Sequence, residues 1–175
     1  MMKEATPRAI KLSDYQPPAY LIDTVDLLVD LREQGTRVVA RLAVRRNPLG
    51  PGGTLRLNGE GLQPVWVRLD GSELPADQYR VDDESLTLND PPQAFVIESE
   101  VIIAPENNTA LEGLYRSAGM FCTQCEPEGF RKITWFIDRP DVMARFTVRL
   151  EADQANCPVL LSNGNPCESG ELPDG

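Results

Sequence analysis

The sequence predicts a mainly β domain of antiparallel strands, and three observations support this prediction. Apolar and polar side chains alternate with a period of two along most of the chain, as in strands with one buried face. Fifteen prolines and 13 glycines among 175 residues interrupt the alternation, which is typical of short strands joined by turns. Only one segment, near residues 127–137, carries apolar residues at helical spacing.

The first two predicted strands form an antiparallel pair. After a turn at residues 33–35, apolar residues alternate with arginines on the second strand. We expect these arginines to face Asp26 and Asp30 of the first strand, which is a structural role. The opposite face of the first strand carries five apolar residues, Leu21, Val25, Leu27, Val29 and Leu31.

Shorter alternating runs predict the remaining strands. In the run 144–152, the even-numbered side chains from Phe146 to Ala152 are expected to face inward. Asn163-Gly164 is a strong hairpin signal, but no returning strand follows it, so we expect the chain to be part of a longer protein. The runs cover residues 54–57, 65–69, 78–81, 85–88, 93–104, 114–115, 120–122, 144–152 and 159–161.

A single short helix is predicted near residues 127–137. Pro127 between two glutamates matches the chemistry of a helix start, where proline and acidic side chains are favoured. Apolar residues then recur at helical spacing from Phe130 to Ile137, until Pro140 ends the pattern.

Composition argues against several classes of function. The net charge of −10 argues against a nucleic-acid partner, because phosphate binding needs clustered Lys and Arg. The chain has no histidine, which removes histidine-dependent nucleophilic catalysis and every zinc site that uses histidine.

The length fits one domain, and no targeting or membrane segment is recognisable. Residues 1–18 are polar and are predicted to form a leader, followed by a β domain over residues 19–175. No apolar run approaches the ~20 residues that span a bilayer. We therefore expect a cytoplasmic protein with no membrane partner, whose four cysteines are reduced.

The stretch FCTQCEPEGF, residues 121–130, holds two cysteines at C-x-x-C spacing. Structural zinc needs four ligands, often as two close pairs, and the other two cysteines, Cys157 and Cys167, do not form such a pair. A redox thiol needs a lowered pKa, usually at a helix start in a β-α-β unit, whereas the surroundings here are antiparallel β. A free-standing zinc- or thiol-based binding module that uses Cys122 and Cys125 remains the alternative hypothesis.

The residues between and after the cysteines offer different chemistry. If residues 122–126 are extended, Gln124 and Glu126 project to the same side. A carboxylate beside an amide suits an ammonium ligand, because one supplies charge and the other directional hydrogen bonds. From the residues alone, the favoured interpretation is that Glu126 only stabilises the helix start, by about 0.3–1 kcal/mol.

A resemblance bears on this choice. Residues 107–153, which include TQCEPEGFRKIT and DRPDV, and the later CPVLLSNGNP closely resemble the N-terminal domain of bacterial aminopeptidase N. That enzyme is a zinc metallo-aminopeptidase of the gluzincin class. The resemblance implies a saddle-like antiparallel β domain that packs on a catalytic domain of the same polypeptide.

The resemblance also implies roles for the TQCE motif. Glu126 would bind the free α-amino group of a peptide substrate, and Gln124 would line the pocket for its first side chain. The cysteines would have no metal role. The H-E-x-x-H zinc motif and the Gly-Ala-Met-Glu-Asn motif of the catalytic domain are absent. Catalytic residues and zinc would therefore belong to the catalytic domain, and this chain would be inactive alone.

Overall fold

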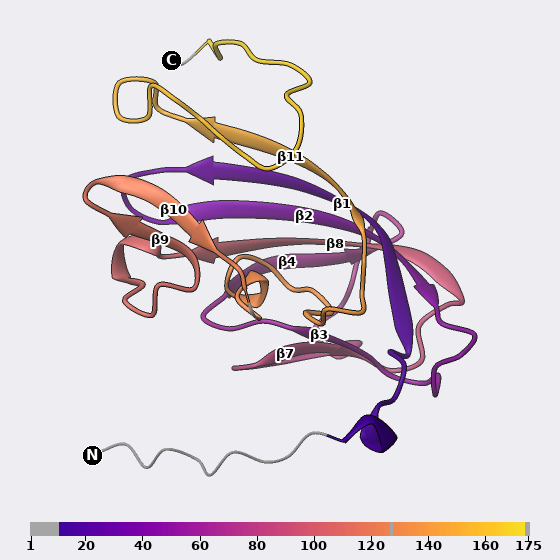
Figure 1. The fold of residues 1–175 in the computed structure, drawn as a ribbon. Helices are drawn as coiled ribbons and strands as arrows, with labels where there is room; N and C mark the ends of the chain where they lie inside the picture. Colours follow the sequence, from indigo (N-terminus) through magenta and orange to yellow (C-terminus); the bar gives the residue numbers. More distant parts are fainter. Residues whose placement is uncertain (1–10, 127, 174–175) are drawn as a thin grey trace.

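The computed structural model describes residues 11–126 and 128–173, and a twisted six-stranded sheet forms its framework (Figure 1). The strand order is β11-β1-β2-β8-β4-β5. Neighbours pair antiparallel except at one edge, so the predicted mainly β, antiparallel class is confirmed. The strands are β1 (Tyr20–Leu31), β2 (Thr36–Arg46), β4 (Gln63–Leu69), β5 (Ser72–Glu73), β8 (Ala94–Ile103) and β11 (Arg145–Ala152).

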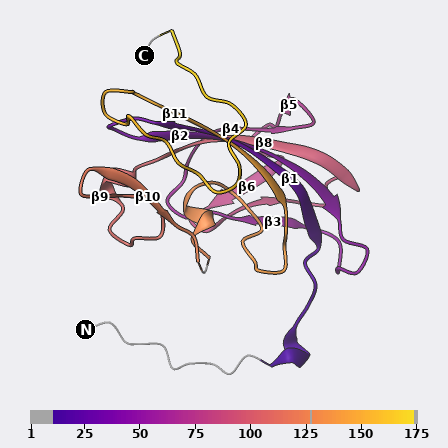
Figure 2. The same cartoon turned by 45° about the horizontal axis from the view of Figure 1, so that its top comes forward.

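Two smaller sheets accompany the main one. A three-stranded sheet lies beneath it, and a two-stranded hairpin stands beside it in both views (Figures 1 and 2). The former contains β3 (Leu55–Asn58), β7 (Ser85–Leu88) and β6 (Tyr79–Asp82), and the latter β9 (Gly113–Ser117) and β10 (Met120–Gln124). In the part of the chain that the structure describes, the remaining elements are three 3-10 turns, η1 (Leu12–Asp14), η2 (Pro105–Asn107) and η3 (Phe130–Lys132). None of the helical segments in the described ranges is long and apolar enough to cross a membrane.

The pair β1–β2 explains the alternation at the start of the chain. Its apolar face is buried, and the opposite face carries the expected charge pairs, with Arg41 3.4 Å from Asp26. Arg37 lies opposite Asp30 in the register, but its guanidinium binds Glu100 on β8 at 3.0 Å instead. The predicted structural role of the arginines is confirmed, although not every partner is the expected one.

A β-bulge shifts the buried face of β1. The register is interrupted between Ile22 and Thr24, so the buried side changes from even-numbered to odd-numbered residues. Ile22 is therefore buried together with Val25, and the placement of Leu21 on that face was wrong.

Strand β11 corrects two further expectations. It pairs with β1 in parallel, and such pairing needs a long connection, which residues 32–144 supply between the two strands. Phe146 and Val148 are expected to face inward, yet they are 46% and 36% exposed. Leu150 and Ala152 are partly buried against the core.

The predicted strand at residues 159–161 is absent. Val159 and Leu161 are 71% and 85% exposed, and no described segment pairs with them. A strand requires a partner for its backbone groups, so β propensity alone does not form one. Asn163-Gly164 forms a bend here, and Gly164 has φ 89°, but no hairpin follows within the described residues.

The predicted helix near residues 127–137 is reduced to the single 3-10 turn η3, so its length and type were wrong. Pro127, its expected first residue, lies outside the described residues. The chain after η3 is extended, and Phe136 forms a β-bridge with Asn58. Burial explains the change, because Trp135, Phe136 and Ile137 are consecutive and all buried. Three consecutive residues of an amphipathic helix point in different directions around its axis, so at least one of them would be exposed.

The division between a leader and a domain stays a prediction. Residues 1–10 lie outside the described residues. The described part of the leader contacts the loop before β11, where the Tyr15 hydroxyl donates to Asp141 at 3.0 Å and Arg139 donates to the carbonyl of Gln16 at 2.9 Å.

Candidate functional site

The hairpin β9–β10 positions Gln124. Its two-residue turn uses Ala118 and Gly119, whose φ angles of 49° and 85° match the twist that hairpins favour. The sequence predicted this turn at residues 117–119. Gln124 is the last residue of β10 and pairs with Gly113 at the base of the hairpin.

Glu126 lies in the turn that follows. The strand ends at Gln124, so the premise of an extended chain through Glu126 was wrong. The Gly129 N–H donates to the Cys125 carbonyl at 3.1 Å, which closes a turn around Glu126. Within it, Glu128 adopts the left-handed conformation with φ 66°.

The structure nevertheless brings the two predicted residues together. The Gln124 side-chain amide donates through Nε2 to the backbone carbonyl of Glu126 at 3.0 Å. Both side chains are exposed on this chain. The two predicted residues therefore lie at one corner, which residues 124–126 and 128–129 form and which we call the Gln124–Glu126 corner.

Two glycines bring the corner against the body of the protein. A Cβ on Gly129 would lie 2.6 Å from the Gln124 carbonyl oxygen and 2.9 Å from the Cys125 Cα. A Cβ on Gly113 would lie 2.6 Å from the Lys132 Cβ. Real Cβ atoms do not approach backbone this closely, so glycine is required at both positions.

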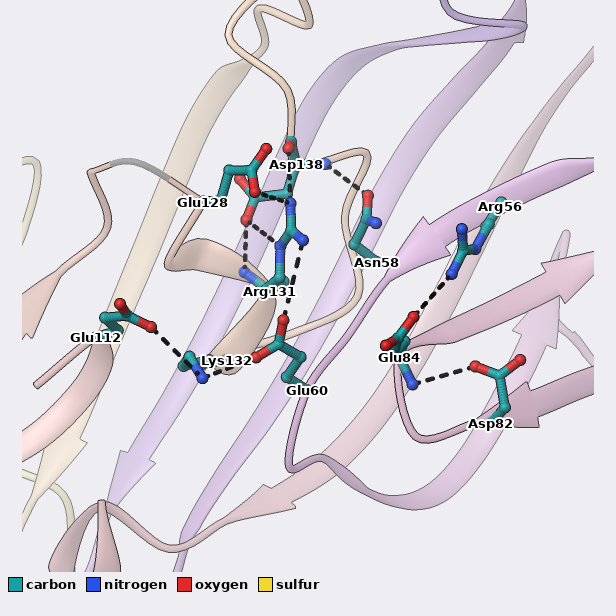
Figure 3. A network of polar contacts seen from close by, with 10 residues as sticks. All are labelled: Arg56, Asn58, Glu60, Asp82, Glu84, Glu112, Glu128, Arg131, Lys132 and Asp138. Atoms are coloured by element: carbon teal, nitrogen blue, oxygen red, sulfur yellow. Dashed lines mark hydrogen bonds and ion pairs between the residues drawn. The ribbon is translucent and has the colours of Figure 1, made fainter. Parts of the chain in front are cut away.

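An ion-pair network contacts the corner through Glu128 (Figure 3). Arg131 is its centre, because its Nε binds Asp138 at 3.0 Å and its guanidinium lies 3.3 Å from Glu128. The side chains of Arg131 and Asp138 are only 15% and 12% exposed. Such partly buried pairs are screened less by solvent than surface pairs are.

The neighbouring cation extends the network to the hairpin. The Lys132 Nζ lies 2.8 Å from Glu60 and 3.6 Å from Glu112. The hydrogen bond with Glu60 raises the pKa of Lys132, so its ammonium stays charged at neutral pH. Sequence reasoning missed this network, because Glu60 is 72 positions from Lys132 along the chain.

The four cysteines are free thiols. Burial raises the pKa of the Cys125 thiol, and the negative charge of Asp138 adds to the effect. A redox or metal-binding cysteine needs a readily formed thiolate, so this environment opposes that use. Within residues 11–126 and 128–173, no three His, Cys, Asp or Glu residues are grouped as metal ligands would be. The side chains of the corner therefore do not fit a zinc site. The geometry gives no support to the alternative hypothesis of a zinc- or thiol-based binding module that uses Cys122 and Cys125.

The fold agrees with the comparison to known families. The model of the peptidase M1 N-terminal domain matches residues 67–175, and the chain belongs to this family.

Two curated relatives are named aminopeptidase N. The protein of Caulobacter vibrioides is 52% identical over 99% of this chain and 20% of its own length. The protein of Escherichia coli is 44% identical over 97% of this chain and 19% of its own length. The chain thus spans about a fifth of the length of the curated relatives it matches.

Solved structures of peptidases also match this chain over part of their own length. The crystal structure of Legionella pneumophila aminopeptidase A in complex with aspartic acid matches with a TM-score of 0.87 and 35% identity, over 94% of this chain and 20% of that one. An M1 zinc metallopeptidase from Deinococcus radiodurans matches with a TM-score of 0.64 and 18% identity, over 78% of this chain and 33% of that one. The latter likeness concerns the fold alone.

Proposed function

We propose that this chain is the substrate-recognising N-terminal domain of a zinc aminopeptidase. In this proposal Glu126 binds the α-ammonium group of a peptide, and Gln124 lines the pocket for its first side chain. The observation that carries the proposal is the hydrogen bond that joins Gln124 to the backbone of Glu126, with both side chains exposed, in a chain whose curated relatives are named aminopeptidase N.

The chemistry of the corner fits this ligand. An ammonium donates three hydrogen bonds and carries a charge, and a carboxylate accepts charge-assisted hydrogen bonds that are stronger than neutral ones. The Gln124 amide is occupied with the Glu126 carbonyl, which leaves its carbonyl end for the pocket. An internal segment of a peptide has no ammonium at this place, so it would leave a covered carboxylate unpaired. That penalty favours peptides with a free N-terminus.

The rest of the polypeptide supplies the remaining parts in this proposal. A catalytic domain that holds zinc packs on this chain and cleaves the peptide bond, whereas residues of this chain bind and orient the substrate. The isolated chain is expected to lack peptidase activity. A cytoplasmic location belongs to the same proposal, and the four free thiols support it, because disulfides form in oxidising compartments.

The test is Glu126→Gln in the full-length polypeptide. It keeps the shape of the side chain and removes the charge, so kcat/KM for an amino-acyl amide should fall by roughly 10- to 100-fold, the equivalent of one charged hydrogen bond. Zinc content should stay unchanged. Glu73→Gln, which removes an exposed carboxylate on β5, is the matched control and should retain activity. Full activity of the Glu126 variant would refute the proposed role.

A further inference from the structure

The turn η3 carries two adjacent cations, and each contacts one of the two arms of the corner through a glutamate (Figure 3). One arm is the turn with Glu126, and Arg131 reaches it through Glu128 at 3.3 Å. The other arm is the hairpin with Gln124. Lys132 reaches its base through Glu112 at 3.6 Å, next to the first residue of β9.

Both cations are also held by the body of the protein. Asp138 Oδ2 accepts hydrogen bonds from the backbone N–H of Arg131 at 3.1 Å and from its Nε at 3.0 Å. The Glu60 carboxylate accepts from Lys132 at 2.8 Å, and the Glu60 N–H donates to the Arg131 carbonyl at 2.9 Å. The two cations therefore connect acceptors in the body of the protein to the two arms.

Both arms contain a strained backbone position, which needs stabilising contacts to persist. Glu128 has φ 66° and Leu111, next to Glu112, has φ 59°. A side chain other than glycine costs roughly 1–2 kcal/mol in this left-handed conformation. Each strained position thus lies at or beside a glutamate that one of the two cations binds.

We propose that Arg131 and Lys132 are positioning residues, which fix the Glu126 turn through Glu128 and the Gln124 hairpin through Glu112. This inference rests on the proposed function, because it concerns the same corner. The two cations contact no substrate in this account. They set where the carboxylate and the amide lie.

The experiment uses Glu128→Gln and Glu112→Gln in the full-length polypeptide. These glutamates are 61% and 54% exposed. When they are replaced, Arg131 keeps its ion pair with Asp138, and Lys132 keeps its ion pair with Glu60. Glu84→Gln is the matched control, since it breaks an exposed pair with Arg56 that is also drawn in Figure 3.

Hydrogen–deuterium exchange is the first readout. Glu128→Gln should accelerate exchange in the peptide that contains Gly129, whose N–H closes the turn, by about 2- to 5-fold, as expected for a partly exposed pair. Glu112→Gln should accelerate exchange in β9 and β10. Glu84→Gln should accelerate exchange neither in the Gly129 peptide nor in β9 and β10. Wild-type exchange in both glutamate variants would overturn the inference, and so would faster exchange throughout the chain, which indicates a general structural role.

Activity is the second readout. Both glutamate variants should raise KM for a free-amine substrate by about 2- to 5-fold at unchanged zinc content, and the control should not. Unchanged KM in both variants, alongside an impaired Glu126→Gln, would overturn the positioning role. If Glu126→Gln is itself fully active, the proposed function fails, whereas the exchange result still decides whether the two cations hold the arms.

Discussion

Gln124 donates its side-chain amide to the backbone carbonyl of Glu126 at 3.0 Å, so the last residue of β10 closes over the turn that carries the carboxylate. The contact links the two residues of the candidate site through a side chain and a backbone atom. Gln124 therefore has a conformational role in the turn in addition to its proposed place in the pocket.

Gln124→Glu tests this conformational role. A carboxylate cannot donate to the Glu126 carbonyl, and it places a second negative charge beside Glu126. Loss of a hydrogen bond of about 0.5–1.5 kcal/mol should accelerate exchange of the turn by roughly 2- to 10-fold. Gln78→Glu adds the same charge at an exposed site between β5 and β6 and should leave the turn unaffected. Equal exchange in both variants would show that the contact does not order the turn.

Gly129→Ala should destabilise the protein. Its φ of −93° suits any residue, so the effect is purely steric: the new Cβ would meet the backbone of Gln124 and Cys125. Overpacking of this kind costs about 1–3 kcal/mol, and thermal denaturation should report a lower Tm. Gly170→Ala is the control, because a Cβ there meets nothing within 4 Å. A Tm equal to that of the control would contradict the close packing of the corner.

The cysteines should react at different rates. Cys125 is partly buried and its thiol pKa is raised by burial and by Asp138, whereas Cys167 is exposed. Iodoacetamide attacks through the thiolate, so at pH 8 it should label Cys167 well before Cys125, as read by mass spectrometry of digested protein. Preferential labelling of Cys125 would restore the thiol-based alternative.

Asp82 should make stability depend on pH in the acidic range. Hydrogen bonds from Arg80, from the Ser85 hydroxyl and from the Glu84 N–H lower its pKa from 3.8 to about 2. The folded state therefore favours the carboxylate. The resulting stability is fully present above the unfolded pKa of 3.8 and is lost as pH falls toward 2.

Asp82→Asn should accordingly have a lower Tm than the wild type at pH 6. The difference between the two proteins should shrink as the pH falls from 4 to 2, because the wild-type carboxyl becomes protonated. Thermal denaturation at several pH values measures this difference. A difference that stays constant with pH would show that the Asp82 charge contributes nothing.

Local patterns predicted much of the fold. The alternation in β1 and β2, the turn at Ala118-Gly119 and most of the short strands follow from side-chain period and turn chemistry. The bulge after Ile22 could not be seen, because one extra residue shifts the buried face without altering the composition.

Long-range contacts explain the remaining differences. The segment after Phe130 has helical spacing, but the core takes Trp135, Phe136 and Ile137 together and holds them extended. The network around Arg131 and Lys132 also includes Glu60, which is distant in sequence, and no local pattern predicts that contact. The roles of Gln124 and Glu126 were predicted from the resemblance, whereas local chemistry alone favoured a helix-start role for Glu126.

The most direct test of the central claim compares two inhibitors of the full-length polypeptide, a free amino acid and its analogue without the amine. The wild type should bind the amine-bearing inhibitor more tightly by about 10- to 100-fold, the value of a charged hydrogen bond. In Glu126→Gln this preference should largely disappear, while the inhibition constant of the amine-free analogue stays the same. A variant that keeps the full preference for the amine would contradict the assignment of Glu126 as the ammonium-binding residue.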